Sequence, residues 1–314
     1  MRDRLDRRTS VTGVLETVTA LHIGAGQPQT TVGTDAPVIR DVLGRPFVPG
    51  SSFKGVLRSN LEALLRSSPG GKLWTCNPLG EKSPNPDDRP CVTREERKAI
   101  FDPDRVPMTT KLAKWTDLLD EKTCSICSLF GSPWLAARVS IPDMPVLGEW
   151  RDSSYRVRDG VAIDRENLTA ATNLKYDFET VSPGTRFAFN LIVENAKGTC
   201  RGGAGKEGED VSEDWELGLI TCGLDLFSRG FATLGGKSSR GLGRVTISIT
   251  GIEDKTAREL LGLVAPVSHA AAGESPAPED DASAKRVEET LALWRKALAT
   301  KLGKGAGGVV QDAS

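Results

Sequence analysis

Alternation of apolar and polar positions along the chain predicts the strands of a sheet. The first strand is expected from Thr12 to Ile23, after a charged and frayed start over residues 1–9. Arg186 to Glu194 alternates most cleanly, which turns every second side chain toward a core. A short strand is expected from Ala137 to Asp143, and the last one begins at Val245.

Apolar positions at helical spacing predict two core helices. The first begins at Ser51 or Ser52, because both are good N-caps after Pro49-Gly50. Its apolar stripe comprises Phe53, Leu57, Leu61 and Leu64. The second helix has Ser212 as its N-cap and acidic residues in its first turn. Its apolar face comprises Trp215, Leu219, Cys222 and Leu226.

Several segments lie outside this order of strands and helices. Residues 68–133 are rich in turn-forming residues and are expected to be an insertion that cannot build a packed sheet by itself. Residues 155–180 are expected to form an extended hairpin. Residues 266–283 have the composition of a linker, residues 284–302 form a helix, and residues 303–314 form a disordered tail. The helix carries on one side Val287, Leu291, Trp294 and Leu298.

Without these segments the order of elements is β-α-β-β-α-β. This order predicts an α+β protein with a ferredoxin-like, RRM-like palm within residues 10–265. Many functions share that fold, so the site must decide the function. The aromatic strand of an ordinary RNA-recognition module is not visible in the sequence, which argues against that module.

Charge and hydropathy narrow the classes of protein. The net charge is −1, so nucleic acid would have to bind to local clusters of cations rather than to a general basic field. We expect a cytoplasmic protein with no membrane partner, because no apolar run approaches the ~20 residues of a membrane span. The first ten residues also lack the apolar core of a signal peptide.

Cysteines are grouped in and beside the insertion. Cys124-Ser-Ile-Cys127 can present two thiolates to one ion, and Cys76 and Cys91 bracket a turn-rich loop that can complete a tetrahedron. Zinc would then replace the missing core of this segment, with Cys200 as an alternative ligand. A redox dithiol at Cys124 and Cys127, or buried cysteines without a special role, are the competing interpretations.

The start of the first helix carries two cations. Lys54 and Arg58 lie one turn apart near the positive end of the helix dipole, an unfavourable place unless an anion sits between them. Together with free backbone N–H groups they predict a phosphate site. The alternative is a solvated basic face on an ordinary amphipathic helix.

A glycine-rich loop from Leu234 to Val245 carries three more cations. It is not a nucleotide-binding P-loop, because it follows a helix, enters a strand and lacks the first glycine. Its backbone can approach a sugar-phosphate chain closely where no Cβ intervenes. The cations expected to contact phosphate are Lys237, Arg240 and Arg244, unless the loop is simply flexible.

Two further polar residues precede the first helix. His22 ends the first strand next to a glycine turn, where it is suited either to ligand contact or to a structural hydrogen bond. Asp35 lies in a loop with several threonines and is suited either to catalysis or to an Asx-turn.

Four separated blocks together resemble the RAMP superfamily, specifically the backbone (family seven) subunit of type III CRISPR–Cas effectors. These blocks are His22-Ile-Gly, Gly33 to Asp41, Pro49-Gly-Ser-Ser-Phe-Lys-Gly-Val-Leu-Arg58 and Gly235 to Arg244. The resemblance runs from the first strand to Ile252. It implies a ferredoxin-like palm, a β-hairpin thumb within 155–180, and several copies assembled along a guide RNA. The cysteine-bearing insertion resembles that of zinc-containing members.

The resemblance also implies a function and its partners. The protein would bind guide RNA (crRNA) and further subunits of the effector complex, and would cleave complementary single-stranded target RNA through Asp35. A loop carboxylate that binds Mg²⁺ or Mn²⁺ can assist attack by the RNA 2′-hydroxyl.

Two alternatives remain open at this stage. A catalytically inactive scaffold subunit would bind guide RNA and its neighbours without cutting. A guide-precursor nuclease would use His22 as general acid or base, and its activity would persist in a chelator.

Overall fold

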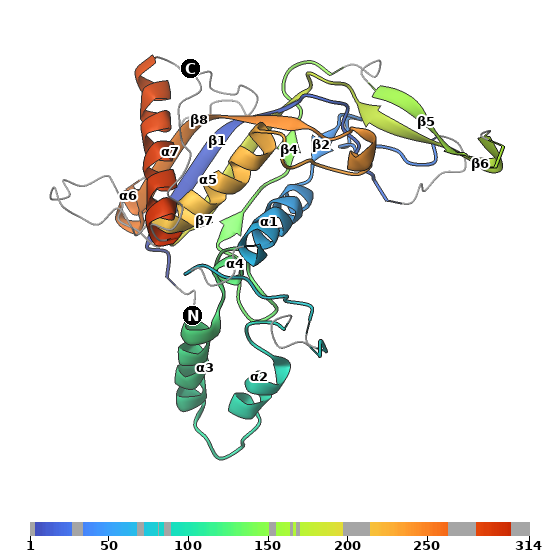
Figure 1. The fold of residues 1–314 in the computed structure, drawn as a ribbon. Coiled ribbons are helices and arrows are strands. Elements are labelled where there is room, and N and C mark those ends of the chain that lie inside the picture. The colour runs from blue at the N-terminus through green and yellow to red at the C-terminus, as the bar shows by residue number, and fades with distance from the viewer. Residues whose placement is uncertain are drawn as a thin grey trace.

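A four-stranded antiparallel sheet forms the centre of the molecule, in the order β3-β7-β1-β8. The computed structural model describes residues 4–26, 34–67, 72–80, 82–84, 89–150, 155–163, 166–167, 170–196, 214–262 and 281–302. The sheet comprises β1 (Arg7–Thr17), β3 (Val139–Ser140), β7 (Arg186–Glu194) and β8 (Val245–Thr256). Helix α1 (Gly50–Arg66) follows β1 in the chain, and α5 (Trp215–Ser228) lies between β7 and β8 (Figure 1).

The first strand starts earlier and ends earlier than its alternation predicts. Strand β1 begins at Arg7, inside the stretch expected to be frayed, and ends at Thr17. Arg7 is buried because its guanidinium pairs with Asp254 on β8 at 2.7 Å and with Asp214 at 2.9 Å. These partners are remote in sequence, so a charged N-terminus alone could not indicate that the strand extends so far.

Helix α1 is capped from outside rather than by a serine. Pro49 occupies the N-cap position without a side-chain cap, and the Gly50 N–H donates to the Asp143 carboxylate at 2.9 Å. The prediction of a Ser51 or Ser52 cap was therefore wrong. A Cβ at Gly50 would lie 1.8 Å from the Ile141 carbonyl oxygen, so the close approach requires glycine.

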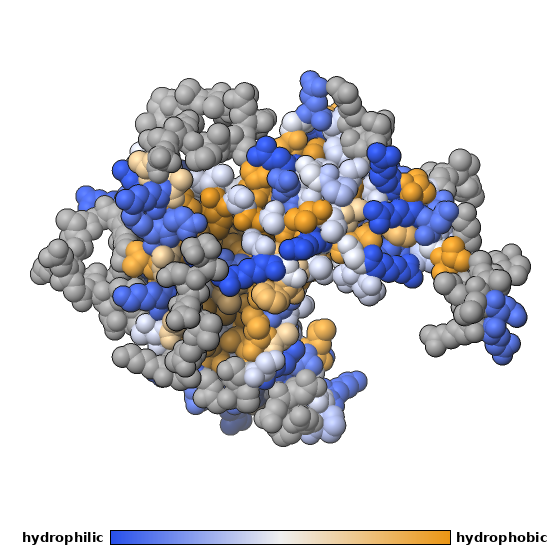
Figure 2. Space-filling model, turned by 45° about the horizontal axis from the view of Figure 1, so that its top comes forward, coloured by the Kyte–Doolittle hydropathy of each residue, from blue (hydrophilic) through white to orange (hydrophobic). Residues whose placement is uncertain are grey.

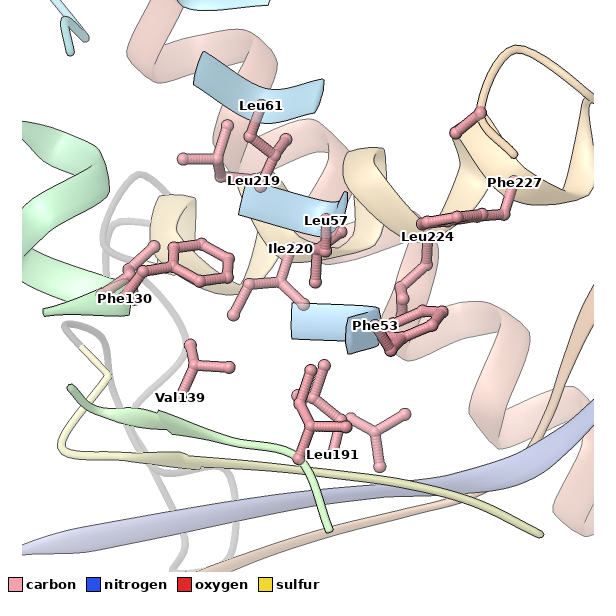
Figure 3. Close-up of a cluster of buried hydrophobic side chains, with 14 of the residues drawn as sticks. Phe53, Leu57, Leu61, Phe130, Val139, Leu191, Leu219, Ile220, Leu224 and Phe227 are labelled. Carbon is pink, nitrogen blue, oxygen red and sulfur yellow. The ribbon is translucent and has the colours of Figure 1, made fainter. Parts of the chain in front are cut away.

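The apolar stripe of α1 forms the core against α5 and the sheet (Figure 3). Phe53 stacks on Phe227 of α5 at 4.9 Å between ring centroids and meets Phe189 of β7 edge-on at 5.6 Å. The predicted stripe is confirmed except at its end, where Leu65 is buried and Leu64 is 42% exposed. The fully buried members of the stripe are Phe53, Leu57 and Leu61.

Helix α5 is buried on nearly all sides, because α7 (Asp281–Leu302) packs on its other flank. The predicted Ser212 cap lies outside the described residues. Of the predicted face, Cys222 and Leu226 are only half-buried. A Cβ at Gly218 would lie 2.2 Å from the Trp294 carbonyl oxygen, so glycine lets the two helices approach closely. The predicted apolar side of α7 is buried as expected, with Val287, Leu291, Trp294 and Leu298.

A long hairpin extends to one side of the sheet (Figure 1). It pairs β5 (Tyr155–Ile163) antiparallel with β6 (Ala170–Val181), where sequence patterning predicts an extended hairpin over 155–180. Val157 and Val161 are exposed on it, and Figure 2 shows apolar residues interspersed with hydrophilic ones along this arm. A small sheet of β2 (Phe47–Val48) and β4 (Met144–Pro145) lies near the base of the hairpin. The short helix α6 (Ala257–Gly262) follows β8 in the chain.

The predicted insertion contains three helices in its described parts. They are α2 (Arg94–Phe101), α3 (Met108–Lys122) and α4 (Ser125–Phe130), and α2 and α3 project away from the sheet (Figure 1). We call residues 72–131 the cysteine lobe. Helix α2 has no buried residue and Lys111 is the single buried residue of α3, so these helices rest on half-buried aromatic contacts among Phe101, Trp115 and Trp134 instead of a buried core. Within the described residues, no helix combines the length and apolar character needed to cross a bilayer.

Candidate functional site

The loop that carries Asp35 is paired with the hairpin strand β6. The Asp35 N–H donates to the Asp177 carboxylate at 2.7 Å, and the Asp177 N–H donates to the Asp35 carboxylate at 3.0 Å. The next residue, Ala36, forms a parallel bridge with Phe178. Asp35 is exposed, so these main-chain contacts hold a carboxylate at the surface beside the base of the hairpin.

Glu179 joins this loop to the predicted histidine. Its carboxylate accepts hydrogen bonds from Val38 N–H at 3.1 Å and from the Arg40 guanidinium at 2.8 Å. Its backbone carbonyl lies 2.7 Å from His22 Nδ1. His22 and Asp35 are thus brought to the same short stretch of β6, although about half the chain separates them from it.

The His22 ring is held in one orientation and one tautomer. It is 7% exposed and packs edge-on against Phe178, with 5.7 Å between the ring centroids. A carbonyl oxygen can only accept, so Nδ1 carries a proton and Nε2 holds the lone pair of the neutral ring. The structural hydrogen bond that the sequence left as an alternative is therefore present.

The glycine loop lies directly against His22. Gly236 N–H donates to the His22 carbonyl at 2.9 Å, and a Cβ at Gly235 would lie 2.3 Å from the same oxygen. Gly235 also has φ of +78°, which favours glycine. The glycines of this loop thus permit close packing on the His22 backbone, and the predicted approach to a sugar-phosphate chain stays a prediction.

Two of the three loop cations surround aromatic residues of β6. Lys237 has φ of +63° and places Nζ 4.6 Å from the ring centroid of Tyr176 and 4.4 Å from that of Phe178. Arg240 donates to the Tyr176 hydroxyl and lies over the same ring. The hydrogen bond from Arg240, with the charge of Lys237, lowers the pKa of Tyr176. Arg244 instead lies against Gly230 after α5.

Four residues of β6 organise this site, and none of them was predicted from the sequence as a site residue. Tyr176 and Phe178 meet the cations and His22, whereas Asp177 and Glu179 hold the Asp35 loop. The alternation of aromatic and acidic residues was the available signal, since neighbouring strand residues point to opposite faces. We call residues 176–179 the junction strand.

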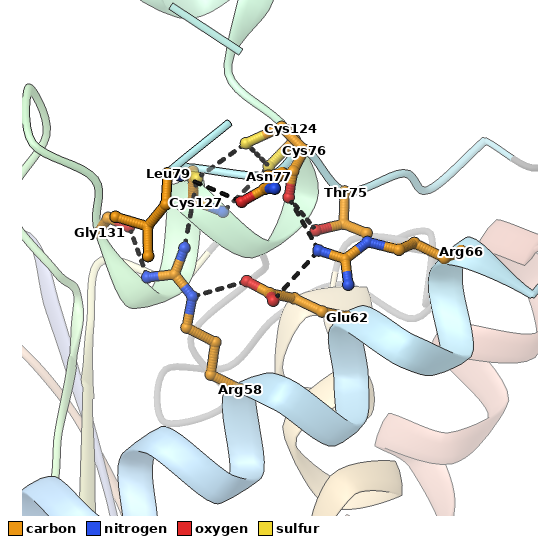
Figure 4. A network of polar contacts seen from close by, with 10 residues as sticks. All are labelled: Arg58, Glu62, Arg66, Thr75, Cys76, Asn77, Leu79, Cys124, Cys127 and Gly131. Carbon is orange, nitrogen blue, oxygen red and sulfur yellow. Dashed lines mark hydrogen bonds and ion pairs between the residues drawn. The ribbon is translucent and has the colours of Figure 1, made fainter. Parts of the chain in front are cut away.

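The two cations of α1 face the cysteine lobe and the adjoining strand instead of an open phosphate site. Lys54 Nζ donates to the Val139 carbonyl at 2.8 Å. Arg58 pairs with Glu62 at 2.8 Å and donates to the Gly131 carbonyl at 3.0 Å, with its third nitrogen 3.6 Å from Cys127 Sγ (Figure 4). This geometry favours a structural role for Arg58 over the predicted phosphate contact, because its donors are already engaged.

Four cysteines converge as their spacing predicted. The sulfur atoms of Cys76, Cys91, Cys124 and Cys127 all lie within 4.8 Å of one another. Cys76 Sγ is 3.5 Å from Cys127 Sγ and 3.7 Å from Cys124 Sγ. A tetrahedral ion with metal–sulfur bonds of about 2.3 Å would separate its ligands by about 3.8 Å. These four sulfurs can therefore bind one metal ion.

The surroundings of the sulfurs also suit a metal. The Cys127 N–H donates to Cys124 Sγ at 3.3 Å, as expected where Cys124 caps α4 and both thiolates turn to one point (Figure 4). Burial alone would lower the pKa of Arg58, but the hydrogen bond to Glu62 and the charge of that carboxylate raise it overall. Cys222 lies in α5, apart from this group, and Cys200 lies outside the described residues.

Comparison with known proteins agrees with this architecture. The RAMP superfamily matches residues 14–246. A protein of Mycobacterium tuberculosis named CRISPR system Cms endoribonuclease Csm3 is 29% identical over 250 residues, which cover 77% of this chain and 86% of that protein. The protein of the same name from Methanothermobacter thermautotrophicus is 26% identical over 270 residues, covering 77% of this chain and 84% of its own.

A shorter alignment has a higher sequence identity. The protein of that name from Methanocaldococcus jannaschii is 49% identical over 51 residues, which are 16% of this chain. Because the superfamily match runs from the end of β1 to the start of β8, it covers the junction strand and the glycine loop. The chain belongs to the RAMP superfamily.

Proposed function

We propose that this protein is a backbone subunit of a type III CRISPR–Cas ribonucleoprotein, which binds guide RNA and cleaves complementary target RNA. The names of its relatives, which describe CRISPR endoribonucleases, support this proposal. The observation that carries it is the junction strand. This strand holds the exposed Asp35 carboxylate on one side and the cations Lys237 and Arg240 on the other.

The architecture has the parts that such a subunit would use. The order of β1, α1, β3, β7, α5 and β8 along the chain, with the sheet order β3-β7-β1-β8, supports a ferredoxin-like palm. The β5–β6 hairpin would be the thumb, which contacts neighbouring copies or RNA. Other subunits of the effector complex are its proposed protein partners.

Cleavage would depend on Asp35. Attack by a 2′-hydroxyl requires in-line geometry, a proton acceptor and stabilisation of charge at the phosphate. A Mg²⁺ or Mn²⁺ ion, when bound, would supply charge stabilisation. Asp35 is suited to hold such an ion because its main chain is fixed and its side chain is exposed. His22 would orient the glycine loop, since Nδ1 is already bound to a carbonyl.

Guide RNA would lie along the glycine loop. Lys237 and Arg240 combine two positive charges with the Tyr176 ring, a combination that suits phosphate and a stacked base. Arg244 extends the same loop and is exposed. His22 contributes its neighbouring backbone to this surface. The α1 cations Lys54 and Arg58 are weaker candidates for RNA contact than the loop cations, because they already donate to backbone carbonyls of the protein.

The metal of the cysteine lobe would be structural Zn²⁺. Four cysteine sulfurs with tetrahedral spacing are the ligand set of structural zinc sites, which have no open position for substrate. The ion would join the segments that flank α2 and α3, which have little apolar core of their own, to the buried helix α4.

The test of the proposed activity is Asp35→Ala in the assembled complex. The wild-type complex should cut complementary RNA in Mg²⁺ or Mn²⁺, stop in EDTA, and give regularly spaced products. The variant should bind target normally and lose about 100-fold or more in cutting rate, because a catalytic group acts mainly at the transition state. Cutting at the wild-type rate would contradict the assignment.

A non-cutting scaffold is the second candidate function. It is favoured by one observation, the bond from Asp177 N–H to the Asp35 carboxylate, which a purely structural aspartate would also make. A wild-type complex that binds target but cuts in no divalent ion would establish this alternative. Cutting that persists in EDTA would instead favour the histidine-driven nuclease.

A further inference from the structure

The Asp35 loop is anchored unevenly along its length. From Ala36 onwards it is bound by Glu179, whose N–H donates to the Ala36 carbonyl at 3.0 Å and whose carboxylate accepts from Val38 N–H. Ile39 N–H adds a bond to the Ile23 carbonyl at 2.9 Å. Asp35 itself is held differently, because both of its hydrogen bonds among the described residues are with Asp177.

We propose that Asp177 is a positioning residue for the cleavage reaction, which acts through Asp35 rather than on the RNA. This inference rests on the proposed function. The Asp177 side chain fixes the Asp35 main chain at 2.7 Å, while its own N–H occupies one oxygen of the Asp35 carboxylate at 3.0 Å. Two contacts in opposite directions restrict both the position and the rotation of that carboxylate, so its other oxygen faces a constant direction.

The acceptor oxygen of Asp177 is the part of the side chain that this role requires. Two neighbouring carboxylates repel each other, so the second negative charge is a cost that the two N–H donors offset. Asparagine at position 177 would retain an oxygen at the same distance from the backbone and remove the charge. Alanine at position 177 would remove both the acceptor oxygen and the charge, and the Asp35 N–H would lose its hydrogen-bond acceptor.

The position of Asp177 also connects catalysis to the hairpin. On β6 it alternates with Tyr176 and Phe178, which meet Lys237, so one strand contacts the cation loop on one face and the Asp35 loop on the other. Across the hairpin it pairs with Asp159 of β5. A displacement of the hairpin base by bound RNA would therefore move the Asp35 carboxylate with it.

The experiment compares Asp177→Ala, Asp177→Asn and the control Asp120→Ala, at an exposed carboxylate of α3, in the assembled complex. Single-turnover cleavage of complementary RNA is measured with saturating complex, together with target affinity and melting temperature. Asp177→Ala should slow cleavage about 10- to 100-fold with unchanged target affinity, because small misplacements of a reacting group have effects of that size. Asp177→Asn should retain most of the rate, and Asp120→Ala should match the wild type.

A titration of Mg²⁺ separates positioning from metal binding. If Asp177 only positions Asp35, the Mg²⁺ concentration for half-maximal cleavage by Asp177→Asn should equal that of the wild type. An Asp177→Asn complex as slow as Asp177→Ala, or one that needs more Mg²⁺, would overturn the inference and indicate a ligand or charge role. Asp177→Asn also remains informative if Asp177→Ala fails to fold.

The outcome is distinguishable from a failure of the proposed function. A wild-type complex that cuts, an Asp35→Ala complex that does not, and an Asp177→Ala complex that cuts normally would overturn this inference alone. A wild-type complex that never cuts would remove both.

Discussion

The junction strand and the cysteine lobe are stabilised in opposite ways. At the junction strand, hydrogen bonds between segments 142 residues apart hold exposed charged side chains in place. In the cysteine lobe, four mostly buried sulfurs within 4.8 Å of one another join segments about 50 residues apart. The first arrangement leaves its polar groups at the surface, where they can act on a ligand. The second encloses its reactive groups, so it supplies structure.

The cysteine lobe is joined to helices α1 and α5 through polar contacts. Arg58 of α1 reaches the Cys127 sulfur, while Arg138 joins the end of α4 to α5 by binding Glu216 and the Ser128 carbonyl. Experiments that weaken one region while the other stays intact would therefore show how far the two are independent.

The largest expected effect is the loss of the metal ligand set by Cys124→Ser. Purified wild-type protein should carry close to one zinc ion per chain, whereas the variant should lose zinc. Stability should fall by about 5 kcal/mol or more, because structural zinc contributes about 10–16 kcal/mol in small zinc domains. Metal analysis and denaturant unfolding provide the measurements.

Cys222→Ser is the matched control for this prediction. Cys222 is a half-buried cysteine outside the sulfur group, so its variant should keep its metal. Wild-type protein that is metal-free and equally stable after chelation would contradict the zinc assignment.

The next effect concerns the joint between the cysteine lobe and α5, tested by Arg138→Ala. Glu216 is fully buried and pairs with Arg138, which is 9% exposed. Removing the arginine would leave a buried carboxylate without its partner, at a cost of about 3–5 kcal/mol. Arg295→Ala breaks a more exposed pair with Asp225 and should cost about 1 kcal/mol or less in the same unfolding assay. Equal effects of the two variants would contradict the buried-joint interpretation.

A smaller effect is expected on RNA retention when loop cations are removed. Lys237→Gln and Arg240→Gln should each lower affinity on all sequences alike and reduce the salt slope by about 0.7 for single-stranded RNA. Lys54→Gln serves as the comparison, since Lys54 donates to the Val139 carbonyl and should change the slope less. A loss confined to particular base sequences would contradict a phosphate role.

The smallest effect is on the titration of Tyr176. The Arg240 hydrogen bond lowers the pKa of Tyr176, so this phenol should ionise below the ordinary value near 10. The lowered pKa of Tyr176 stabilises the folded state only when the pH rises past the pKa of Tyr176 in the folded protein. At neutral pH the phenol is not ionised, so this effect does not change the free energy of unfolding there. Phenolate absorbance should show an early step that moves to higher pH in Arg240→Gln. An unchanged curve in Tyr176→Phe would show that the early step belongs elsewhere.

Much of the core could be predicted because its signal is local. The clean alternation of Arg186–Glu194 became β7, and the stripe that contains Phe53 and Leu57 became the buried face of α1. The end of that stripe was missed, since Leu64 and Leu65 differ in burial only through what lies beside the last turn. The grouping of the four cysteines was also predictable, because the spacing of Cys124 and Cys127 is typical of metal ligands.

Partners that come from remote segments could not be predicted in the same way. The sequence by itself determined which faces are apolar, where glycines allow close approach, and which residue types can bind metal or phosphate. Only the tertiary structure decided that Asp143 caps α1, that Arg58 turns to Cys127, and that Asp177 holds Asp35. Periodicity records whether a side chain is buried, whereas a hydrogen bond depends on which distant segment arrives within about 3 Å of it.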